Sequence, residues 1–237
     1  MNPANERLQA IRQRLAEAAR RAGREPAEVR LIAVSKKQPV AAIQALAELG
    51  VRDFGESQVQ EALGKIEHFE GRGLNWHLIG HLQSNKTRHV PGHFHWVHSV
   101  DSARLARRLS EAAGAGGPPL KLLLQVNVAG DPAKHGLLPA DLYATVDELL
   151  GQQLHGVEVC GLMTIGYLEA GESRARASFA ALRRLLEGCR QRFGDSFHEL
   201  SMGMSGDFET AIEEGATMVR VGTALFGARS QAGDFSG

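Results

Sequence analysis

Short apolar stretches alternate with helical stretches along almost the whole chain. The first apolar stretch, residues 31–35, precedes a helical pattern at 40–49, and seven more stretches follow, which begin at residues 51, 75, 95, 120, 157, 198 and 217. The stretch over 120–128 is expected to be the longest strand, and the last stretch is expected to open into the loop "TALFGAR", which begins at Thr223. Apolar strands that are each followed by a helix are typical of a parallel sheet covered by helices on its outer side. Eight such units in 237 residues predict an α/β fold, a single (β/α)8 TIM barrel. A doubly wound open sheet is the structural alternative, and it would need a reversal of strand order that the sequence does not show.

The first segment, residues 1–23, is expected to form an extra amphipathic helix that packs on the barrel, because Leu8, Ile11 and Leu15 recur at spacings of three and four. The Gly/Pro-rich stretch 114–119 is long enough for a turn but too short for a linker between domains. We therefore predict one domain over residues 1–237.

The charge balance argues against partners that depend on a strong overall field. Lys and Arg number 27, as do Asp and Glu, so the formal net charge is zero and nothing draws the protein as a whole toward nucleic acid or an anionic membrane. No apolar run approaches membrane-spanning length, and the N-terminus lacks the apolar core of a secretory signal. The two cysteines, Cys160 and Cys189, have no metal-binding spacing. These features predict a cytoplasmic protein, with Cys160 as a buried thiol in an apolar strand.

Lys36 directly follows the first apolar strand and is the first candidate for chemistry. In a (β/α)8 barrel, functional groups lie at the C-terminal ends of the strands. If Lys36 faces inward with Ile32 and Val34, the apolar barrel mouth disfavours its charged form and leaves a neutral amine that can form a Schiff base with a carbonyl. The alternative is that Lys36 and Lys37 are simply solvated residues at a strand end.

Two loops near the end of the chain contain the residues of a phosphate site. The loop after the seventh strand carries Ser205, Gly206 and Asp207, and the loop after the eighth carries Gly222 and Thr223. In barrels, phosphate groups often bind to these two loops through backbone N–H groups and hydroxyls. Taken singly, Asp207 could serve only as a helix N-cap and Gly222 only as a turn glycine.

Arg220 lies two residues before Gly222 and is expected to reach the same level of the barrel. Its alternative role is an ion pair at the barrel mouth. An amine, a phosphate cradle and a guanidinium together favour a site for pyridoxal 5′-phosphate, in which the lysine forms the imine, the glycine-rich loops hold the phosphate, and an arginine or an aspartate faces the pyridine nitrogen. An arginine does not give that nitrogen a proton, so the ring would stay unprotonated and would be a weaker electron sink than one paired with aspartate.

We predict no metal site among the histidines. His77 and His81 are four residues apart, but they fall on a predicted strand and turn and not on one helix face. His93, His95 and His98 are also close in sequence, yet ordinary loop and strand positions are the simpler interpretation, because metal sites need convergent ligands and a supporting shell.

Seven ordered motifs extend over nearly the whole chain: "AVSKKQP", "FGESQVQEA", "WHLIGHLQSNK", "VNVAGDPAKHG", "GLMTIG", "LSMGMSGDFETAI" and "VRVGTALFGAR". Together they closely resemble the YggS-like family of pyridoxal phosphate homeostasis proteins, which are similar to the isolated N-terminal barrel of alanine racemases. The resemblance implies the same barrel and the cofactor pyridoxal 5′-phosphate.

The resemblance also implies a role for each candidate residue. Lys36 would carry the cofactor as a Schiff base, and Arg220 would face the pyridine nitrogen. Three positions would contact the phosphate, with Gly206 as their neighbour; they are Ser205, Gly222 and Thr223. One motif departs from the family: the chain reads "FGES" where the family usually reads "FGEN", so Ser57 leaves any contact made by that asparagine in doubt.

By the same resemblance, the protein would act in intracellular pyridoxal phosphate homeostasis, by buffering or delivery, without catalytic turnover. Alanine racemases need a second, β-rich domain with a catalytic tyrosine, whereas this chain ends shortly after "LFGAR" and neither Tyr143 nor Tyr167 is in a racemase-like context. The implied partners are apo forms of pyridoxal phosphate-dependent enzymes, with the protein as a monomer or weak homodimer.

Two alternative functions would use the same reactive lysine. One is a single-domain, pyridoxal phosphate-dependent amino-acid racemase, which would need a second proton-transfer group. The other is a cofactor-free barrel enzyme in which Lys36 forms an imine with a sugar phosphate.

Overall fold

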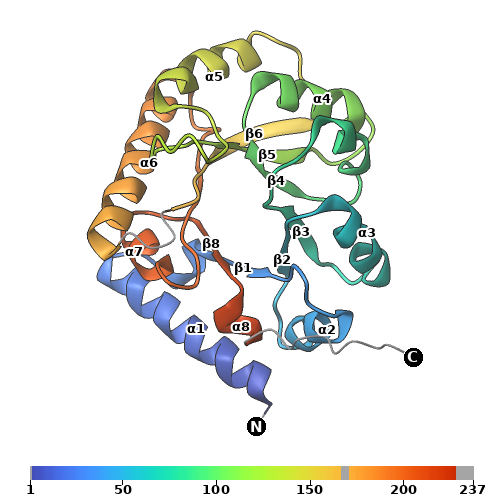
Figure 1. Ribbon diagram of the computed structural model, residues 1–237, viewed down its shortest axis with the longest axis vertical. Helices are drawn as coiled ribbons and strands as arrows, with labels where there is room; N and C mark the ends of the chain where they lie inside the picture. Colours follow the sequence, from blue (N-terminus) through green and yellow to red (C-terminus); the bar gives the residue numbers. More distant parts are fainter. Residues whose placement is uncertain (1, 167–170, 228–237) are drawn as a thin grey trace.

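Eight parallel strands close into a barrel in which neighbours in sequence are also neighbours in space (Figure 1). The computed structural model describes residues 2–166 and 171–227. The closing pair is β1 with β8, in parallel register from Arg30 opposite Met218 to Ala33 opposite Val221. The prediction of a (β/α)8 barrel is therefore confirmed. The strands are Arg30–Val34 (β1), Asp53–Glu56 (β2), Asn75–Leu78 (β3), Trp96–Val100 (β4), Leu120–Gln125 (β5), Val157–Met163 (β6), Glu199–Ser201 (β7) and Met218–Val221 (β8).

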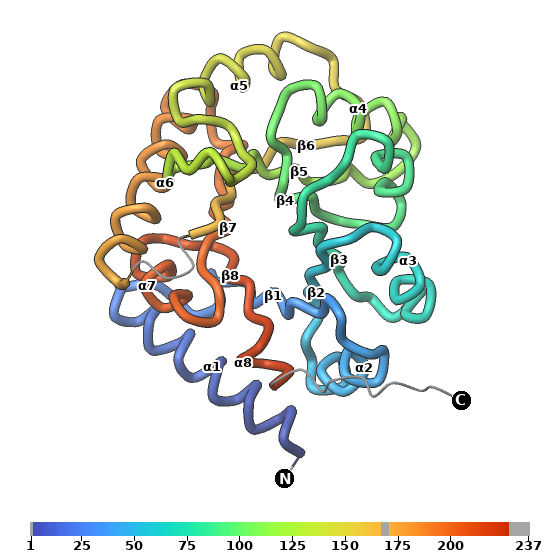
Figure 2. The backbone as a smooth tube through the Cα atoms, in the orientation of Figure 1, coloured from blue at the N-terminus to red at the C-terminus, as the bar shows by residue number. Residues whose placement is uncertain are grey.

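Helices surround the strand barrel on its outer side, as the backbone trace shows (Figure 2). Among the residues that the structure describes, no helix is both long and apolar enough to cross a membrane. The α-helices are Pro3–Arg21 (α1), Val40–Glu48 (α2), Val59–His68 (α3), Ala103–Ala113 (α4), Leu142–Leu150 (α5), Gly171–Phe193 (α6), Phe208–Glu213 (α7) and Thr223–Phe226 (α8). The described residues also form three 3₁₀ helices: Pro26–Glu28 (η1), Ser84–His89 (η2) and Pro139–Asp141 (η3).

Two elements differ from the sequence prediction. The segment that begins at Thr223 was expected to be a loop, but it forms the short helix α8. The strand expected over 120–128 ends at Gln125, so β6, with 7 residues, is longer than β5, with 6. The chain leaves the ladder there because Asn127 Nδ2 donates hydrogen bonds to the carbonyls of Asp131 (2.8 Å) and Lys134 (3.2 Å), which starts a loop instead of a strand.

Helix α1 is the predicted extra N-terminal helix, and it lies along the outside of the barrel beside α7 and α8 (Figure 1). Leu8, Ile11 and Leu15 are all buried, which confirms the amphipathic pattern. The Asn2 side chain caps the helix by accepting a hydrogen bond from the N–H of Ala4. Ion pairs also join α1 to α7, such as Arg14–Glu209 at 2.7 Å. They are partly exposed, so they contribute less to stability than the burial of the apolar side chains of α1.

Side chains along the strands alternate between the barrel interior and the layer under the helices. Ile32 belongs to an interior cluster with residues of β4, β5, β6 and β8, whereas its neighbour Ala33 packs in the outer core. This alternation confirms that Ile32 points into the barrel. It also makes the inward positions of every strand a single set of side chains that can meet across the interior.

Both cysteines are buried, as predicted for Cys160. Burial raises the pKa of the Cys160 thiol to about 12 and that of the Cys189 thiol to about 11. Thiolates react and thiols do not, so we expect neither cysteine of the native protein to react with a disulfide reagent at pH 8, and both to react after unfolding in guanidinium. A colorimetric thiol titration in the two conditions measures this. Rapid native labelling of either cysteine would contradict the buried environment.

Candidate functional site

Lys36 lies on the turn that follows β1 and is exposed. The expectation of a desolvated amine is therefore wrong. Strand β1 ends at Val34, two residues before Lys36, so the lysine sits beyond the sheet and its side chain meets solvent. Its position at the C-terminal end of β1 is as expected, and exposure leaves the amine accessible to an aldehyde.

The residues on either side of Lys36 are fixed by buried polar groups. The Nζ of Lys65, on α3, donates to the carbonyl of Ser35 at 2.9 Å. The hydroxyl of Ser35 donates to Oε1 of Glu56 at 2.6 Å. The N–H of Lys37 donates to Oε1 of Glu61 at 2.5 Å, and Lys37 has a φ of 59°, which a non-glycine residue adopts only where contacts hold it. The turn that presents Lys36 is thus held on both sides.

Glu56 and Lys65 form a nearly solvent-free ion pair beneath this turn. Their closest atoms, Oε1 and Nζ, are 2.9 Å apart, and the side chains are 0% and 10% exposed. Burial raises the pKa of Glu56, although the hydrogen bonds from Ser35 and Lys65 oppose that rise. The second carboxyl oxygen of Glu56 is buried and has no hydrogen-bond partner among the described residues, so the removal of Lys65 would leave this group poorly compensated.

The two late loops meet at the same end of the barrel. The N–H of Gly222 donates to the hydroxyl of Ser205 at 3.3 Å, which joins the loop after β8 to the loop after β7. A β-carbon built on Gly222 would lie 3.4 Å from the β-carbon of Val34, so the loop lies directly beside the end of β1. The predicted phosphate loops are therefore adjacent to each other and to the strand that leads to Lys36.

These loops retain donors for an anion. Gly206 and Thr223 are exposed, and a β-carbon on Gly206 would meet nothing within 4 Å. Among residues 2–166 and 171–227, no backbone carbonyl accepts from the N–H of Gly206 or Thr223. Asp207 is the N-cap residue of α7, but its side chain makes no capping hydrogen bond and instead accepts from the N–H of Met204 at 2.6 Å, which stabilises the loop.

Arg220 is the buried cation of the site. It projects from β8 into the barrel and is 5% exposed. Its Nη1 donates to the hydroxyl of Ser201 at 2.6 Å and its Nη2 to the carbonyl of Thr164 at 2.9 Å. Burial lowers the pKa of Arg220 to about 10, and the negative charge of Asp207 opposes that shift. The guanidinium therefore stays charged at neutral pH, with two neutral hydrogen-bond partners and no ion pair among the described residues.

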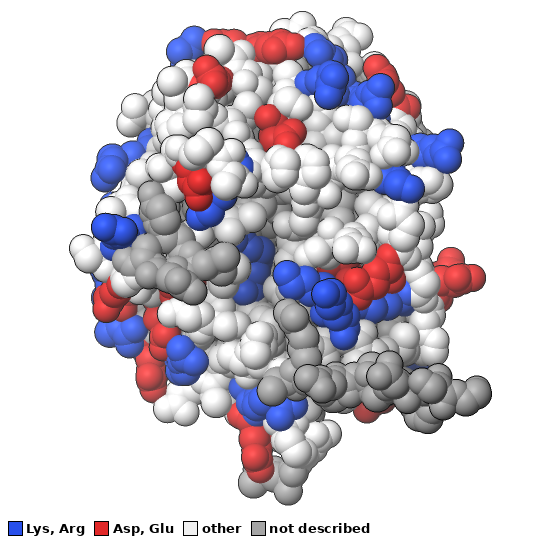
Figure 3. Space-filling view, in the orientation of Figure 1, with Lys and Arg blue, Asp and Glu red and all other residues white. Residues whose placement is uncertain are grey.

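This donor set fits pyridoxal 5′-phosphate. A primary amine is accessible at the end of β1, open N–H donors lie at the ends of β7 and β8, and a buried guanidinium lies on β8. Basic side chains are visible in and beside a hollow near the centre of the face drawn in Figure 3. Ser57 is half-buried at the end of β2, where its backbone lies so close to Gly80 that a β-carbon there would be 2.3 Å from the Ser57 carbonyl oxygen.

The histidines that are close in sequence lie in different environments. His98 is fully buried inside the barrel, whereas His93 and His95 are exposed. His77 is also fully buried, and its Nδ1 is 2.9 Å from Nε2 of His98. His77 was expected on a strand and His98 at an ordinary loop or strand position; both lie on strands and are fully buried.

His81 belongs to a different group of side chains, after β3. Among the described residues, His81, Asp101 and His135 are a group whose ligand atoms all lie within 4.8 Å of one another, and His81 and His135 are exposed. The rings of these two histidines stack face to face, with centroids 4.0 Å apart.

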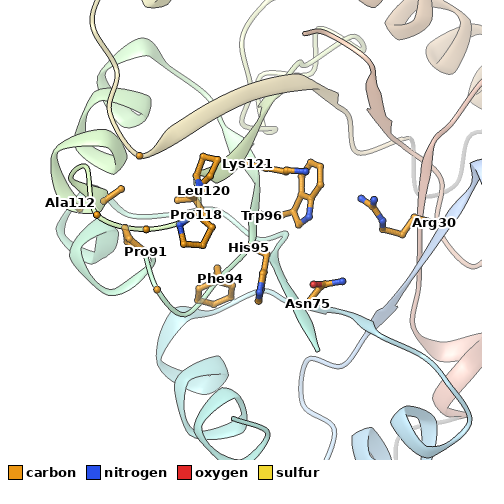
Figure 4. Close-up of a pocket in the computed structure, with 16 residues that line it drawn as sticks. Arg30, Asn75, Pro91, Phe94, His95, Trp96, Ala112, Pro118, Leu120 and Lys121 are labelled. Carbon is orange, nitrogen blue, oxygen red and sulfur yellow. The ribbon is translucent and has the colours of Figure 1, made fainter. Parts of the chain in front are cut away.

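A cavity of about 620 Å³ lies at the other end of the barrel. It is lined by residues at the N-terminal ends of several strands, and Arg30 and Lys121 approach the Trp96 ring to 5.1 and 4.9 Å (Figure 4). Chemistry in (β/α)8 barrels takes place at the C-terminal ends of the strands, so this cavity is not the candidate site.

Comparison with known proteins adds to this geometry. The family described as "Alanine racemase, N-terminal domain" matches residues 7–230. A protein of Pseudomonas aeruginosa named pyridoxal phosphate homeostasis protein is 49% identical over 229 residues, which covers 97% of both chains. The chain belongs to the pyridoxal phosphate homeostasis protein family. The motifs quoted above thus led to the correct family.

Solved structures agree with this family assignment. PipY of Synechococcus elongatus, whose structure was determined with pyridoxal phosphate bound, is 44% identical, with a TM-score of 0.79 over 90% of this chain and 100% of that one. The alanine racemase of Corynebacterium glutamicum is only 19% identical, with a TM-score of 0.65, and this chain covers 63% of it. Family members and racemases thus share the barrel, and the likeness to the racemase extends to the fold alone.

Proposed function

We propose that this protein binds pyridoxal 5′-phosphate at Lys36 and acts in pyridoxal phosphate homeostasis by holding and delivering the cofactor. The observation that carries the proposal is the convergence of Lys36, Arg220 and the two late loops at one end of the barrel. The name shared by close relatives and the cofactor bound in the PipY structure support it.

Each residue has a distinct part in the proposed site. The bound cofactor supplies an aldehyde that condenses reversibly with the Nζ of Lys36 as a Schiff base. The phosphate is held by Ser205, Gly222 and Thr223, with Gly206 leaving room for it. The charged guanidinium of Arg220 faces the pyridine nitrogen and keeps it unprotonated, which weakens the ring as an electron sink and suits carriage more than turnover.

The proposal also covers the proteins that receive the cofactor and the compartment in which the transfer takes place. Apo forms of pyridoxal phosphate-dependent enzymes would accept the cofactor, and the protein would act in the cytoplasm as a monomer or weak homodimer, with residues 1–237 as one domain. The formal net charge of zero gives no attraction to nucleic acid or membrane surfaces.

We expect the purified protein to bind pyridoxal phosphate in a 1:1 complex that absorbs visible light, because the Schiff base extends the conjugation of the ring. Absorbance titration measures both the stoichiometry and the affinity. Transfer can then be followed by mixing the loaded protein with an apo-transaminase and measuring recovered transaminase activity. A protein that stays colourless at cofactor concentrations that load a control enzyme would overturn the proposal.

A racemase function is disfavoured by the position of Tyr143. Tyr143 lies on α5, outside the barrel, and its hydroxyl is next to α6, where a β-carbon built on Gly188 would be 2.1 Å from it. Tyr167 falls outside the described residues. We expect no enzyme-like exchange of the α-hydrogen when the loaded protein is incubated with amino acids in deuterated water; NMR or mass spectrometry measures the exchange, and rapid incorporation would favour the racemase.

A further inference from the structure

A continuous line of polar side chains crosses the barrel interior from Asp53 to Arg220. Asp53 Oδ1 lies 3.0 Å from Nε2 of His77, and Nδ1 of His77 lies 2.9 Å from Nε2 of His98. Nδ1 of His98 lies 2.8 Å from the hydroxyl of Ser201, which accepts from Nη1 of Arg220 at 2.6 Å. The four strands β2, β3, β4 and β7 thus contribute one residue each to a chain that ends on β8.

The carboxylate at one end sets the direction of every hydrogen bond. An ionised Asp53 can only accept, so His77 donates through Nε2 and its Nδ1 must accept. His98 then donates to His77 through Nε2 and accepts through Nδ1, and Ser201 donates to His98 while accepting from Arg220. Each donor meets one acceptor, with both histidines neutral in the Nε2–H form.

The environment of each group supports this set of charges. Burial opposes ionisation of Asp53, but the hydrogen bond from His77 and the positive charge of Arg30 outweigh it and lower the pKa of Asp53. Burial lowers the pKa of His77, and it holds the pKa of His98 well below its ordinary value with help from the positive charges nearby. At neutral pH the chain therefore has a negative end at Asp53 and a positive end at Arg220.

Packing alone does not account for this arrangement. The interior of a (β/α)8 barrel is usually filled by branched apolar residues, which cost nothing to desolvate. Here His77, His98 and Ser201 are 0% exposed and occupy inward positions. Unpaired polar groups at such positions would make the fold less stable than valine or leucine would, so their burial requires that they be hydrogen-bonded to one another. The histidines also pack on Trp96, with the rings of His77 and Trp96 stacked at 5.7 Å, which restricts their rotation.

We propose that Asp53, His77, His98 and Ser201 are positioning residues. The chain of hydrogen bonds that they form begins at Asp53, near the opposite end of the barrel, and orients the guanidinium of Arg220. The inference rests on the proposed function, in which Arg220 faces the ring of pyridoxal phosphate. Within the described part of the chain, two hydrogen bonds fix the guanidinium, and one of them ends on Ser201, so the loss of this chain of side chains frees the group to turn away from the ring.

Ser201→Ala tests the link nearest to Arg220 with the loss of a single oxygen atom. Ser178→Ala is the matched control, because Ser178 is also buried but its hydroxyl has no hydrogen-bond partner among the described residues. We expect Ser201→Ala to bind pyridoxal phosphate about tenfold more weakly, as is typical for the loss of a hydrogen bond to a charged group, and to shift the visible band. Ser178→Ala should match the wild type in both measurements.

Asp53→Asn tests whether the far end of the chain matters. Because the amide can donate as well as accept, the variant no longer dictates the histidine tautomers, and we expect the band to shift although Asp53 does not touch the cofactor site. ¹⁵N NMR of the cofactor-free wild type should show His77 and His98 neutral, with the proton on Nε2. In the same sample, the Nε–H of Arg220 should exchange slowly with water, and it should exchange faster in Ser201→Ala but not in Ser178→Ala.

The outcomes separate this inference from the proposed function. If the wild type forms the Schiff base and Ser201→Ala and Asp53→Asn match it in affinity and spectrum, the inference is overturned while the proposed function stands. If the wild type binds no cofactor but the NMR signals are as expected, the proposed function fails and the positioning of Arg220 stands. A protonated Nδ1 on His98 would overturn the inference, whether or not the variants fold.

Discussion

Replacing Lys36 by alanine is expected to abolish the visible band of the protein–cofactor complex. Lys37 leaves the turn with its backbone held at a φ of 59° by the hydrogen bond of its N–H to Glu61, and the Nζ of Lys65 is committed to buried partners, so we expect neither amine to replace that of Lys36. Without the covalent link, only the phosphate and Arg220 contacts remain, and we expect the affinity to fall roughly a hundredfold, about 2.7 kcal/mol. Absorbance titration of Lys36→Ala measures both effects.

The matched control is Lys37→Ala, which removes a neighbouring exposed amine from the same turn. It should keep the band and bind within about threefold of the wild type, because a solvated side chain away from special features contributes little. An unchanged band in Lys36→Ala, or a lost band in Lys37→Ala with native circular dichroism, would place the Schiff base on another lysine.

Replacing Lys65 by methionine should cost about 3 kcal/mol of unfolding free energy, because it leaves the fully buried Glu56 without its cation. We place the cost at the lower end of the range for broken buried ion pairs because the pKa of Glu56 is already raised by burial, so the group can take up a proton. The variant should also loosen the turn around Lys36, since Lys65 donates to the Ser35 carbonyl. Chemical denaturation and cofactor titration measure the two effects.

The cost of Lys65→Met should depend on pH. The folded-state pKa of Glu56 lies above its ordinary value of 4.5, and it should rise further in the variant, so protonation favours the folded state. This contribution is fully present below the unfolded pKa and is lost as the pH rises through the folded pKa, so the deficit should be larger at pH 7 than at pH 4.

The double variant Glu56→Gln/Lys65→Met is the control for this deficit. It removes the buried charge together with its partner, and it should recover at least about half of the lost stability and most of the pH dependence. A single Lys65→Met variant within about 0.5 kcal/mol of the wild type at both pH values would show that the pair behaves like an exposed surface ion pair.

The sequence was sufficient to predict the barrel because each strand and helix carries its own local pattern. The apolar run at β1 and the i, i+3, i+4 spacing of Leu8, Ile11 and Leu15 depend only on neighbours in the chain. The end of β5 was misplaced for the opposite reason. Asn127 ends the strand through hydrogen bonds to loop carbonyls, and such contacts depend on the path of the loop and not on the strand sequence.

The site was predictable only in part. The chain positions of Lys36, Arg220 and the late loops followed from the rule that barrel sites lie at strand ends. The exposure of Lys36 did not, because it depends on β1 ending at Val34. The line from Asp53 to Arg220 was missed because it needs the register of five strands. The alternation of side chains along a strand places His77 and His98 inward, and this alternation was the feature of the sequence that could have indicated their role.

The most direct test of the account is reduction of the protein–cofactor complex with borohydride, followed by peptide mass mapping. Borohydride converts a Schiff base into a stable secondary amine and so records which lysine carried which carbonyl compound. We predict one pyridoxyl phosphate group per chain, on the peptide that contains Lys36, and none in Lys36→Ala. A label on another lysine, or a trapped sugar phosphate in its place, would contradict the central claim that Lys36 carries pyridoxal phosphate.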